Sequence, residues 1–228
     1  MSIKRKSAPQ ESSSTVEYDN LVGGDFEGRL IYVADLGLHT HEHKGVQKPD
    51  VQKLAMCFEI LDNPVTIDGE QVPRTIWAAS FNVYNSLTAL GTELKYYNVF
   101  DPQAKEGDVA DWDAVLGMPA SLAIVNKPSK DGDAVYDNIV GITPIPEKYR
   151  GQVSAAQTTD MSASGDEDMD SPAMKALRGL AKWQFDRRID GGTGVSTYEA
   201  SKAQAPKKAV VKATPKQDTD DWVDDIPF

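Results

Sequence analysis

Residues 51–61, VQKLAMCFEIL, form the stretch whose pattern decides the fold class. Apolar side chains fill every second position, which is the period of a β-strand with one face against a core. The apolar positions are Leu54, Met56, Phe58 and Ile60, and the positions between them are Lys53, Ala55, Cys57 and Glu59. The stretch predicts a half-buried strand over Val51–Leu61 in a mainly β domain.

Strands are also expected on both sides of this stretch. Phe26–Leu38 follows two glycines and is rich in residues of high β propensity. Asn63–Glu70 is expected to be a turn, in which Asp68-Gly69 suits type I′. Val72–Asn82 is the expected third strand, and its mixed alternation predicts that both faces are partly covered.

The spacing of apolar residues then changes to that of a helix over Tyr84–Tyr97. The leucines at this spacing are Leu87, Leu90 and Leu94, and the candidate caps are Asn85 and Ser86. An acidic loop is expected over Asp101–Asp113, followed by a helical turn at Asp113–Leu116.

Two further strands are expected after the helix. Pro119–Lys127 places Leu122 and Ile124 inward, and Tyr136–Ile145 follows a loop over residues 128–134. Three strands, a helix and a two-stranded hairpin are the order of an OB-fold, a five-stranded barrel with a helix after strand three. An ordinary α+β sheet also fits this order.

The charge of the chain restricts the ligands it can hold. The sequence has 24 Lys and Arg against 35 Asp and Glu, a net charge of −11. Residues 1–150 alone hold 14 basic and 22 acidic side chains. Bulk phosphate neutralisation on duplex DNA is therefore excluded. Any binding of nucleic acid needs a local basic groove with stacking aromatic residues.

Cysteine and histidine usage argues against a structural metal or a disulfide framework. Cys57 is the single cysteine and lies in an apolar run, which indicates a buried thiol. His39, His41 and His43 alternate into the polar connection that is expected over Thr40–Asp50, but no second cluster supplies further ligands. We expect a solvated loop without a metal. No apolar run has membrane-spanning length, so a soluble, cytoplasmic protein is expected.

Composition divides the chain into segments with different expected roles. Ser171-Pro172 suits the start of a helix, because serine caps and proline fits the first helical position. The expected segments are a disordered arm at 1–20, the OB-fold domain at 21–150, an acidic linker at 151–170, an amphipathic helix at 171–190, a flexible basic linker at 191–217 and an acidic tail at 218–228.

The chain ends in DDWVDDIPF, residues 220–228. A terminal carboxylate beside an aromatic ring suits a partner pocket with a basic rim and an apolar floor. Residues 224–228 resemble the C-terminal tip of bacterial single-stranded DNA-binding proteins. The body, with Leu116-Gly117-Met118-Pro119 before the fourth strand, is similar to single-stranded DNA-binding proteins of bacteriophages. Its acidity departs from that pattern.

The resemblance implies a non-catalytic protein that coats unpaired DNA and recruits replication or recombination proteins through its tip. On an OB-type fold, the face around strands two and three and the adjoining loops supply the DNA contacts. The candidate DNA-binding residues are Arg29, Tyr32, Lys44, Lys48, Lys53, Arg74, Trp77, Lys127, Lys130 and Tyr136. The candidate tail residues are Asp220, Asp221, Trp222, Asp224, Asp225, Ile226, Pro227 and Phe228.

No residue constellation nominates a catalytic site or a cofactor. The acid pairs Asp111/Asp113 and Asp131/Asp133 have no histidine or lysine base nearby in sequence. Two alternatives stay open beside DNA coating. One is an adaptor whose OB-like domain binds protein, and the other is a nuclease that uses the acidic loops. The sequence also leaves a homo-oligomer open.

Overall fold

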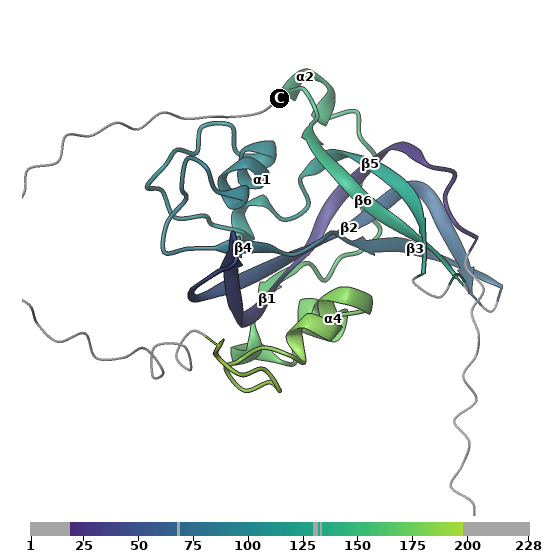
Figure 1. Ribbon diagram of the computed structural model, residues 1–228. Helices are drawn as coiled ribbons and strands as arrows, with labels where there is room; N and C mark the ends of the chain where they lie inside the picture. Colours follow the sequence, from purple (N-terminus) through teal and green to yellow (C-terminus); the bar gives the residue numbers. More distant parts are fainter. Residues whose placement is uncertain (1–18, 68, 130–131, 133, 198–228) are drawn as a thin grey trace, which may run out of the picture.

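The computed structural model describes residues 19–67, 69–129, 132 and 134–197. Within this part, the chain forms a mainly β fold around one seven-stranded sheet, in the order β3-β2-β1-β5-β6, with β4 added to β2 and β7 to β1 (Figure 1). The strands are β1 (Gly24–His43), β2 (Val46–Ile67), β3 (Glu70–Trp77), β4 (Phe81–Val83), β5 (Pro119–Pro128), β6 (Val135–Pro144) and β7 (Ser162–Ser164).

The helices of the described residues are short. They are α1 (Thr92–Phe100), α2 (Glu147–Arg150), α3 (Pro172–Lys175) and α4 (Gly179–Phe185), with 3₁₀ turns η1 (Asp113–Val115) and η2 (Asp166–Asp168). None of them is long and apolar enough to cross a membrane. The expected helical turn after the acidic loop is confirmed by η1.

The strands β1 and β2 are longer than expected and make one continuous antiparallel hairpin. The ladder runs out to His43 and Val46, so the expected polar connection over Thr40–Asp50 is wrong. Lys44 and Gly45 form the turn with φ of 51° and 74°, the positive values that a type I′ turn requires. Backbone pairing continues there because polar side chains on an exposed hairpin do not interrupt the ladder.

The third expected strand is present in two pieces, and the expected helix is displaced. The backbone leaves the ladder after Trp77 and resumes as β4, which pairs with residues 52–54 of β2. Helix α1 begins at Thr92, not near Tyr84. Leu87 bonds through its backbone to Asp108 and Gly107 of the acidic loop, and Leu90 is fully exposed. These loop contacts compete with a helix over residues 84–91.

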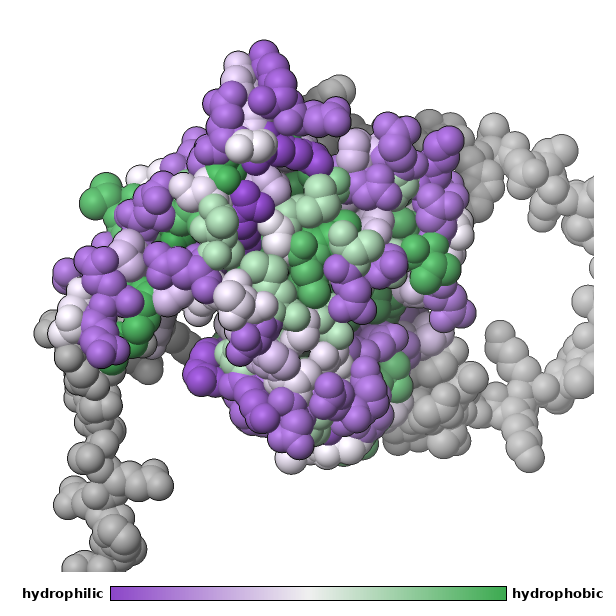
Figure 2. Space-filling model, turned by 180° about the vertical axis from the view of Figure 1, so that it is seen from behind, coloured by the Kyte–Doolittle hydropathy of each residue, from purple (hydrophilic) through white to green (hydrophobic). Residues whose placement is uncertain are grey.

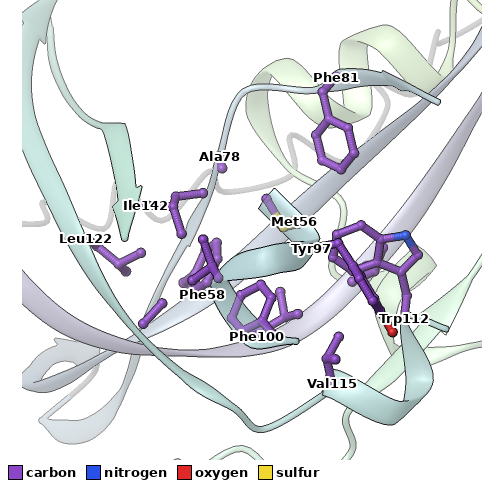
Figure 3. Packing of buried hydrophobic residues seen from close by; sticks show 14 of the residues in the cluster. Met56, Phe58, Ala78, Phe81, Tyr97, Phe100, Trp112, Val115, Leu122 and Ile142 are labelled. Atoms are coloured by element: carbon purple, nitrogen blue, oxygen red, sulfur yellow. The ribbon is translucent and has the colours of Figure 1, made fainter. Parts of the chain in front are cut away.

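The main core lies between the sheet and α1. Leu122 and Ile124 point into it as expected, and Phe58 stacks on Phe100 with ring centroids 6.4 Å apart. Trp112 meets Tyr97 edge-on at 5.2 Å, so the acidic loop is tied to α1 by an aromatic pair (Figure 3). The predicted inward face of β2 is confirmed at Met56, Phe58 and Ile60.

The sheet differs from the closed barrel that we expected. Among the described residues, β3 and β6 share no ladder, although they form the two ends of the strand order. A side-chain bridge spans this seam instead: the guanidinium of Arg74 lies 3.4 Å from the Asp137 carboxylate. Both side chains are largely buried, so the seam is shut by an ion pair in place of backbone hydrogen bonds.

Residues 151–190, which we call the C-terminal segment, cover the face of β1 and β2 that points away from the main core. We expected a linker at 151–170, but this segment runs along the sheet and supplies β7, which pairs in parallel with Tyr32–Ala34. The carboxylate of Glu59 accepts bonds from the backbone N–H groups of Gln157 and Thr158, at 2.7 and 2.9 Å. These contacts hold the segment against β2.

The expected helix over residues 171–190 is two short helices. Ser171 caps α3 by accepting the Met174 N–H, as its sequence predicts. Helix α3 ends at Lys175, and Gly179, the first residue of α4, has a left-handed φ of 53° that interrupts the helical path between them. Apolar side chains of both helices pack on the sheet in a second core cluster, which consists of Ala34, Leu36, Ala55, Met174, Leu177, Ala181 and Phe185. We call residues 171–190 the C-terminal arm.

Candidate nucleic-acid interface

Four of the predicted DNA-binding residues lie on one face of the sheet. Arg29 pairs with Glu59, and both Tyr32 and Trp77 pair with Cys57 across the β1-β2-β3 ladders. Lys53 precedes Cys57 by four residues, so it projects to the same side. The opposite side carries Met56 and Phe58 of the main core. We call this the outer face.

Arg29 binds protein groups with its whole guanidinium. Its Nε donates to the carbonyl of Ser154 at 2.6 Å, and its two terminal nitrogens donate to Gly117 and Val153 at 2.6 and 2.8 Å. These bonds tie β1 to the start of the C-terminal segment and to the loop before β5. The arrangement makes Arg29 a brace between three segments.

The two aromatic residues of the outer face are covered by the C-terminal segment. Tyr32 lies beside Ser162 of β7, and burial raises the pKa of its hydroxyl, with smaller contributions from Cys57, Asp160 and Glu59. Trp77 donates its Nε1–H to the carbonyl of Ala176 at 3.1 Å and packs against the second core cluster. Both residues are only partly exposed, which limits the ring surface that a base could stack on.

Lys53 and Arg74 are also partly withdrawn from solvent. Desolvation lowers the pKa of the half-buried Lys53 ammonium. Arg74 is not on the outer face: it bridges the seam to Asp137 and donates its Nε–H to the carbonyl of Asn63 at 3.2 Å. Its cation is therefore neutralised by a neighbouring carboxylate.

The remaining candidates lie on two hairpins. Lys44 and Lys48 belong to the β1–β2 hairpin, and Lys127 lies directly opposite Tyr136 in the β5–β6 hairpin. Tyr136 is 58% exposed. Because β5 pairs only with the first residues of β1, the two hairpin turns lie toward opposite ends of that strand (Figure 1). Lys130 lies outside the described residues.

The histidines lie in β1, and one of them is buried. The Nε2 atom of His39 lies 3.0 Å from the carbonyl of Leu36, which fixes Nε2 as the protonated nitrogen of the neutral ring. Burial lowers the pKa of His39. The prediction of a solvated histidine loop is wrong here. Within the described ranges, no group of three or more His, Cys, Asp or Glu is arranged to hold a metal.

Two surface hollows do not carry the predicted contacts. One of about 540 Å³ is lined by Glu27, Thr143 and Tyr149 among others, and it has no lysine or arginine in its lining. The other, of about 190 Å³, contains Glu93, whose pKa is raised by burial although Trp112 and the backbone of Tyr84 donate to it. Both linings lack the cations that phosphates need.

Sequence reasoning missed two residues with clear structural consequences. Glu59 anchors the C-terminal segment. An acid on the outward side of an otherwise apolar strand was the sequence feature that could have predicted a bound partner there. Trp183 is 52% exposed on α4. Its position between the buried Ala181 and Phe185, at a spacing that places it on another side of the helix, was the sequence feature that could have predicted this exposure. Figure 2 shows the opposite side of the molecule from Figure 1, where apolar residues gather in the middle of a mainly hydrophilic surface.

The predicted tail residues, Asp220 to Phe228, lie outside the described residues. No protein-family model matches this sequence, and no curated protein matches it. Evidence for a function therefore comes from the residues of this chain alone.

Proposed function

We propose that this protein is a non-catalytic single-stranded DNA-binding protein built on a partly open OB-type sheet. The strand order β3-β2-β1-β5-β6, with α1 between the first meander and the last hairpin, supports this fold. The Arg74–Asp137 bridge supports it further, because it joins the two strands whose contact would complete the barrel.

One observation carries the proposal. Eight of the ten residues chosen from the sequence as nucleic-acid contacts lie on the outer face or on the β1–β2 and β5–β6 hairpins, whereas Arg74 lies at the seam and Lys130 outside the described residues. In this account Lys44, Lys48 and Lys127 hold phosphates, and the exposed ring of Tyr136 stacks on a base. Binding of this kind has little sequence preference, because every base has a π-face.

The tail has a separate part in the proposal. Phe228 and its carboxylate recruit replication or recombination proteins, and the surrounding aspartates speed encounter with basic surfaces. The resemblance of residues 224–228 to the tip of bacterial single-stranded DNA-binding proteins supports this role.

The test is a binding titration of the full chain with oligo-dT and with duplex DNA of equal length over a series of salt concentrations. We expect the single strand to bind more tightly than the duplex at every salt concentration. Equal binding to both DNAs, or binding to neither, contradicts the proposal.

Residues 151–190 cover the outer face, and this favours a second candidate function, that of an adaptor whose sheet binds protein. Tyr32 and Trp77 are partly covered by the chain itself, which limits their access to bases. The adaptor predicts no binding of oligo-dT, together with loss of replication-protein capture when Phe228 is deleted. The titration and a pull-down with the deleted chain separate the two functions.

A further inference from the structure

The C-terminal arm is basic on an acidic body. Residues 171–190 hold five Lys and Arg against two Asp, whereas residues 19–170 hold 11 against 25. The cations of the arm are Lys175, Arg178, Lys182, Arg187 and Arg188. An anionic ligand that approaches this molecule therefore meets attraction at the arm and repulsion over most of the remaining surface.

Part of this charge is not used inside the protein. Lys175 pairs with Asp170, Lys182 with Asp186, and Arg188 lies 3.6 Å from Asp166. Within the described ranges, Arg178 and Arg187 form no ion pair. Arg178 donates to carbonyls at the end of α3, so Arg187, two residues after the end of α4, is the cation of the arm that is most available to an external anion.

Helix α4 presents an apolar stripe away from the sheet, beside this cation. Ala181 and Phe185 face the second core cluster, whereas Leu180 and Trp183, three residues apart, are 58% and 52% exposed. The Arg187 guanidinium lies over the Trp183 ring, 4.3 Å from its centroid. A guanidinium over an indole is a cation–π pair, and single-strand binding surfaces combine stacking aromatic residues with arginines of this kind.

We propose that Leu180, Trp183 and Arg187 form a second contact surface for single-stranded nucleic acid. A base stacks on Trp183, packs along Leu180, and places its phosphate against Arg187. This inference rests on the proposed function and adds to it a surface outside the predicted set of residues. The arm that withdraws Trp77 from solvent supplies another tryptophan on its own outward side.

The position of the arm fits a strand path that continues from the flanking hairpins. The second core cluster holds α3 and α4 against β1 and β2, and Figure 1 shows α4 on the side of the sheet away from β5 and β6. The chain leaves the arm with a hydrogen bond from Thr197 to Gln47 of the β1–β2 hairpin. That hairpin carries Lys44 and Lys48. The arm and these two lysines are therefore neighbouring parts of the surface.

The test compares Trp183→Ala and Arg187→Gln with the wild-type chain in oligo-dT titrations at several salt concentrations. Loss of the stacked base should weaken binding by about fivefold or more in Trp183→Ala. Arg187→Gln should weaken binding and reduce the steepness of the salt dependence by about 0.7, the contribution of one phosphate contact on a single strand. Both side chains are exposed, so we expect both variants to stay folded. Thermal melting checks this.

The chain offers a matched control on α2. Tyr149 is 46% exposed, and the ammonium of Lys148 lies 4.6 Å from its ring centroid, so this pair repeats the chemistry at the other end of the molecule (Figure 1). Tyr149→Ala should bind oligo-dT as the wild type does.

If the wild type binds oligo-dT and Trp183→Ala binds it equally well, the second surface is wrong and the proposed function stands. If the wild type does not bind, both fail. An equal loss of oligo-dT affinity in Tyr149→Ala also overturns the proposal, because any exposed aromatic residue would then contribute to binding.

A peptide of residues 218–228 distinguishes a protein ligand from DNA on this surface. Its charge and its aromatic residues also suit a basic, apolar patch. If Trp183→Ala loses the peptide but keeps its affinity for oligo-dT, the surface is a protein-docking site and the proposal is overturned.

Discussion

Three backbone carbonyls from two separate segments surround the guanidinium of Arg29. Only arginine offers donors in a planar fork that can satisfy all three at once. The side chain therefore acts on the position of residues 153 and 154, where the C-terminal segment first meets β1. Its charge matters less than its geometry.

Replacing Arg29 by lysine tests this role. The ammonium keeps the charge but cannot reach all three carbonyls, so we expect the free energy of unfolding to fall by about 2–3 kcal/mol. Urea unfolding measures the loss, and limited proteolysis between residues 151 and 162 reports release of the segment. Unchanged stability combined with weaker binding of oligo-dT would instead identify Arg29 as a phosphate contact.

His39 gives the protein a pH dependence near neutrality. Its pKa is lowered chiefly by burial and also by Lys53, while the Leu36 carbonyl, Asp190 and Asp35 act in the opposite direction. Below the ordinary histidine pKa of 6.5, the unfolded chain binds a proton that the folded ring resists. The folded state is therefore fully stable above this pH and loses stability as the pH falls through it.

We expect His39→Gln to flatten this profile between pH 7.5 and 5, because the amide can still donate to Leu36 but does not titrate. Chemical denaturation at a series of pH values measures both proteins. Parallel profiles for the wild type and the variant would assign the pH dependence to another group.

At the scale of elements, the β5–β6 hairpin is the best exposed of the sites chosen from sequence. Lys127 and Tyr136 lie opposite each other, with the ring in solvent. Tyr136→Ala should weaken oligo-dT binding about fivefold or more and leave the melting temperature unchanged. Tyr84→Ala, which removes a ring of similar exposure from the loop after β4, is the control and should bind normally. Equal effects of the two variants would contradict a specific role for the hairpin.

The sequence predicts those elements whose local pattern and tertiary contacts agree. The alternation over residues 51–61 gives β2 and its core face, and two further alternating stretches give β5 and β6 within a residue or two. Residues 84–91 have helical spacing, but Gly107 and Asp108 bond to Leu87 from a loop that no local pattern links to it. A long-range contact of this kind overrides local propensity.

The outer face was predicted as a set of residues but not as a covered surface. Plain alternation would put Arg29 and Tyr32, three residues apart, on opposite faces, and the register shift between Leu30 and Tyr32 brings them to the same one. The sequence does not reveal that residues 151–170 return to the sheet, because their composition is that of a spacer. The small residues Ala34 and Ala55 were the available signal, since they leave room for a helix.

At the scale of the whole molecule, charge is separated into an acidic body, a basic arm and linker, and an acidic end. Residues 218–228 hold five aspartates, and residues 171–217 hold ten Lys and Arg. The tail therefore has basic surfaces of its own chain within reach. At low salt we expect it to compete there with the phosphates of DNA.

Deleting residues 218–228 should tighten oligo-dT binding at low salt, and the difference should vanish as salt screens the charges. Replacing Asp220, Asp221, Asp224 and Asp225 by asparagine keeps the length and should reproduce the effect. Fluorescence titrations at low and high salt measure both chains. Unchanged affinity of both variants at low salt would remove competition from the account.

The cover that residues 151–190 place on the sheet also sets an order of events during synthesis. Leu36, Ala55 and Trp77 leave the ribosome well before Met174 and Phe185, which pack against them. At a translation rate of about 5–20 residues per second, the apolar side of β1 and β2 stays bare for roughly 5–20 s. The nascent chain is therefore expected to be most prone to aggregation in that interval, which ends when the arm closes on the sheet.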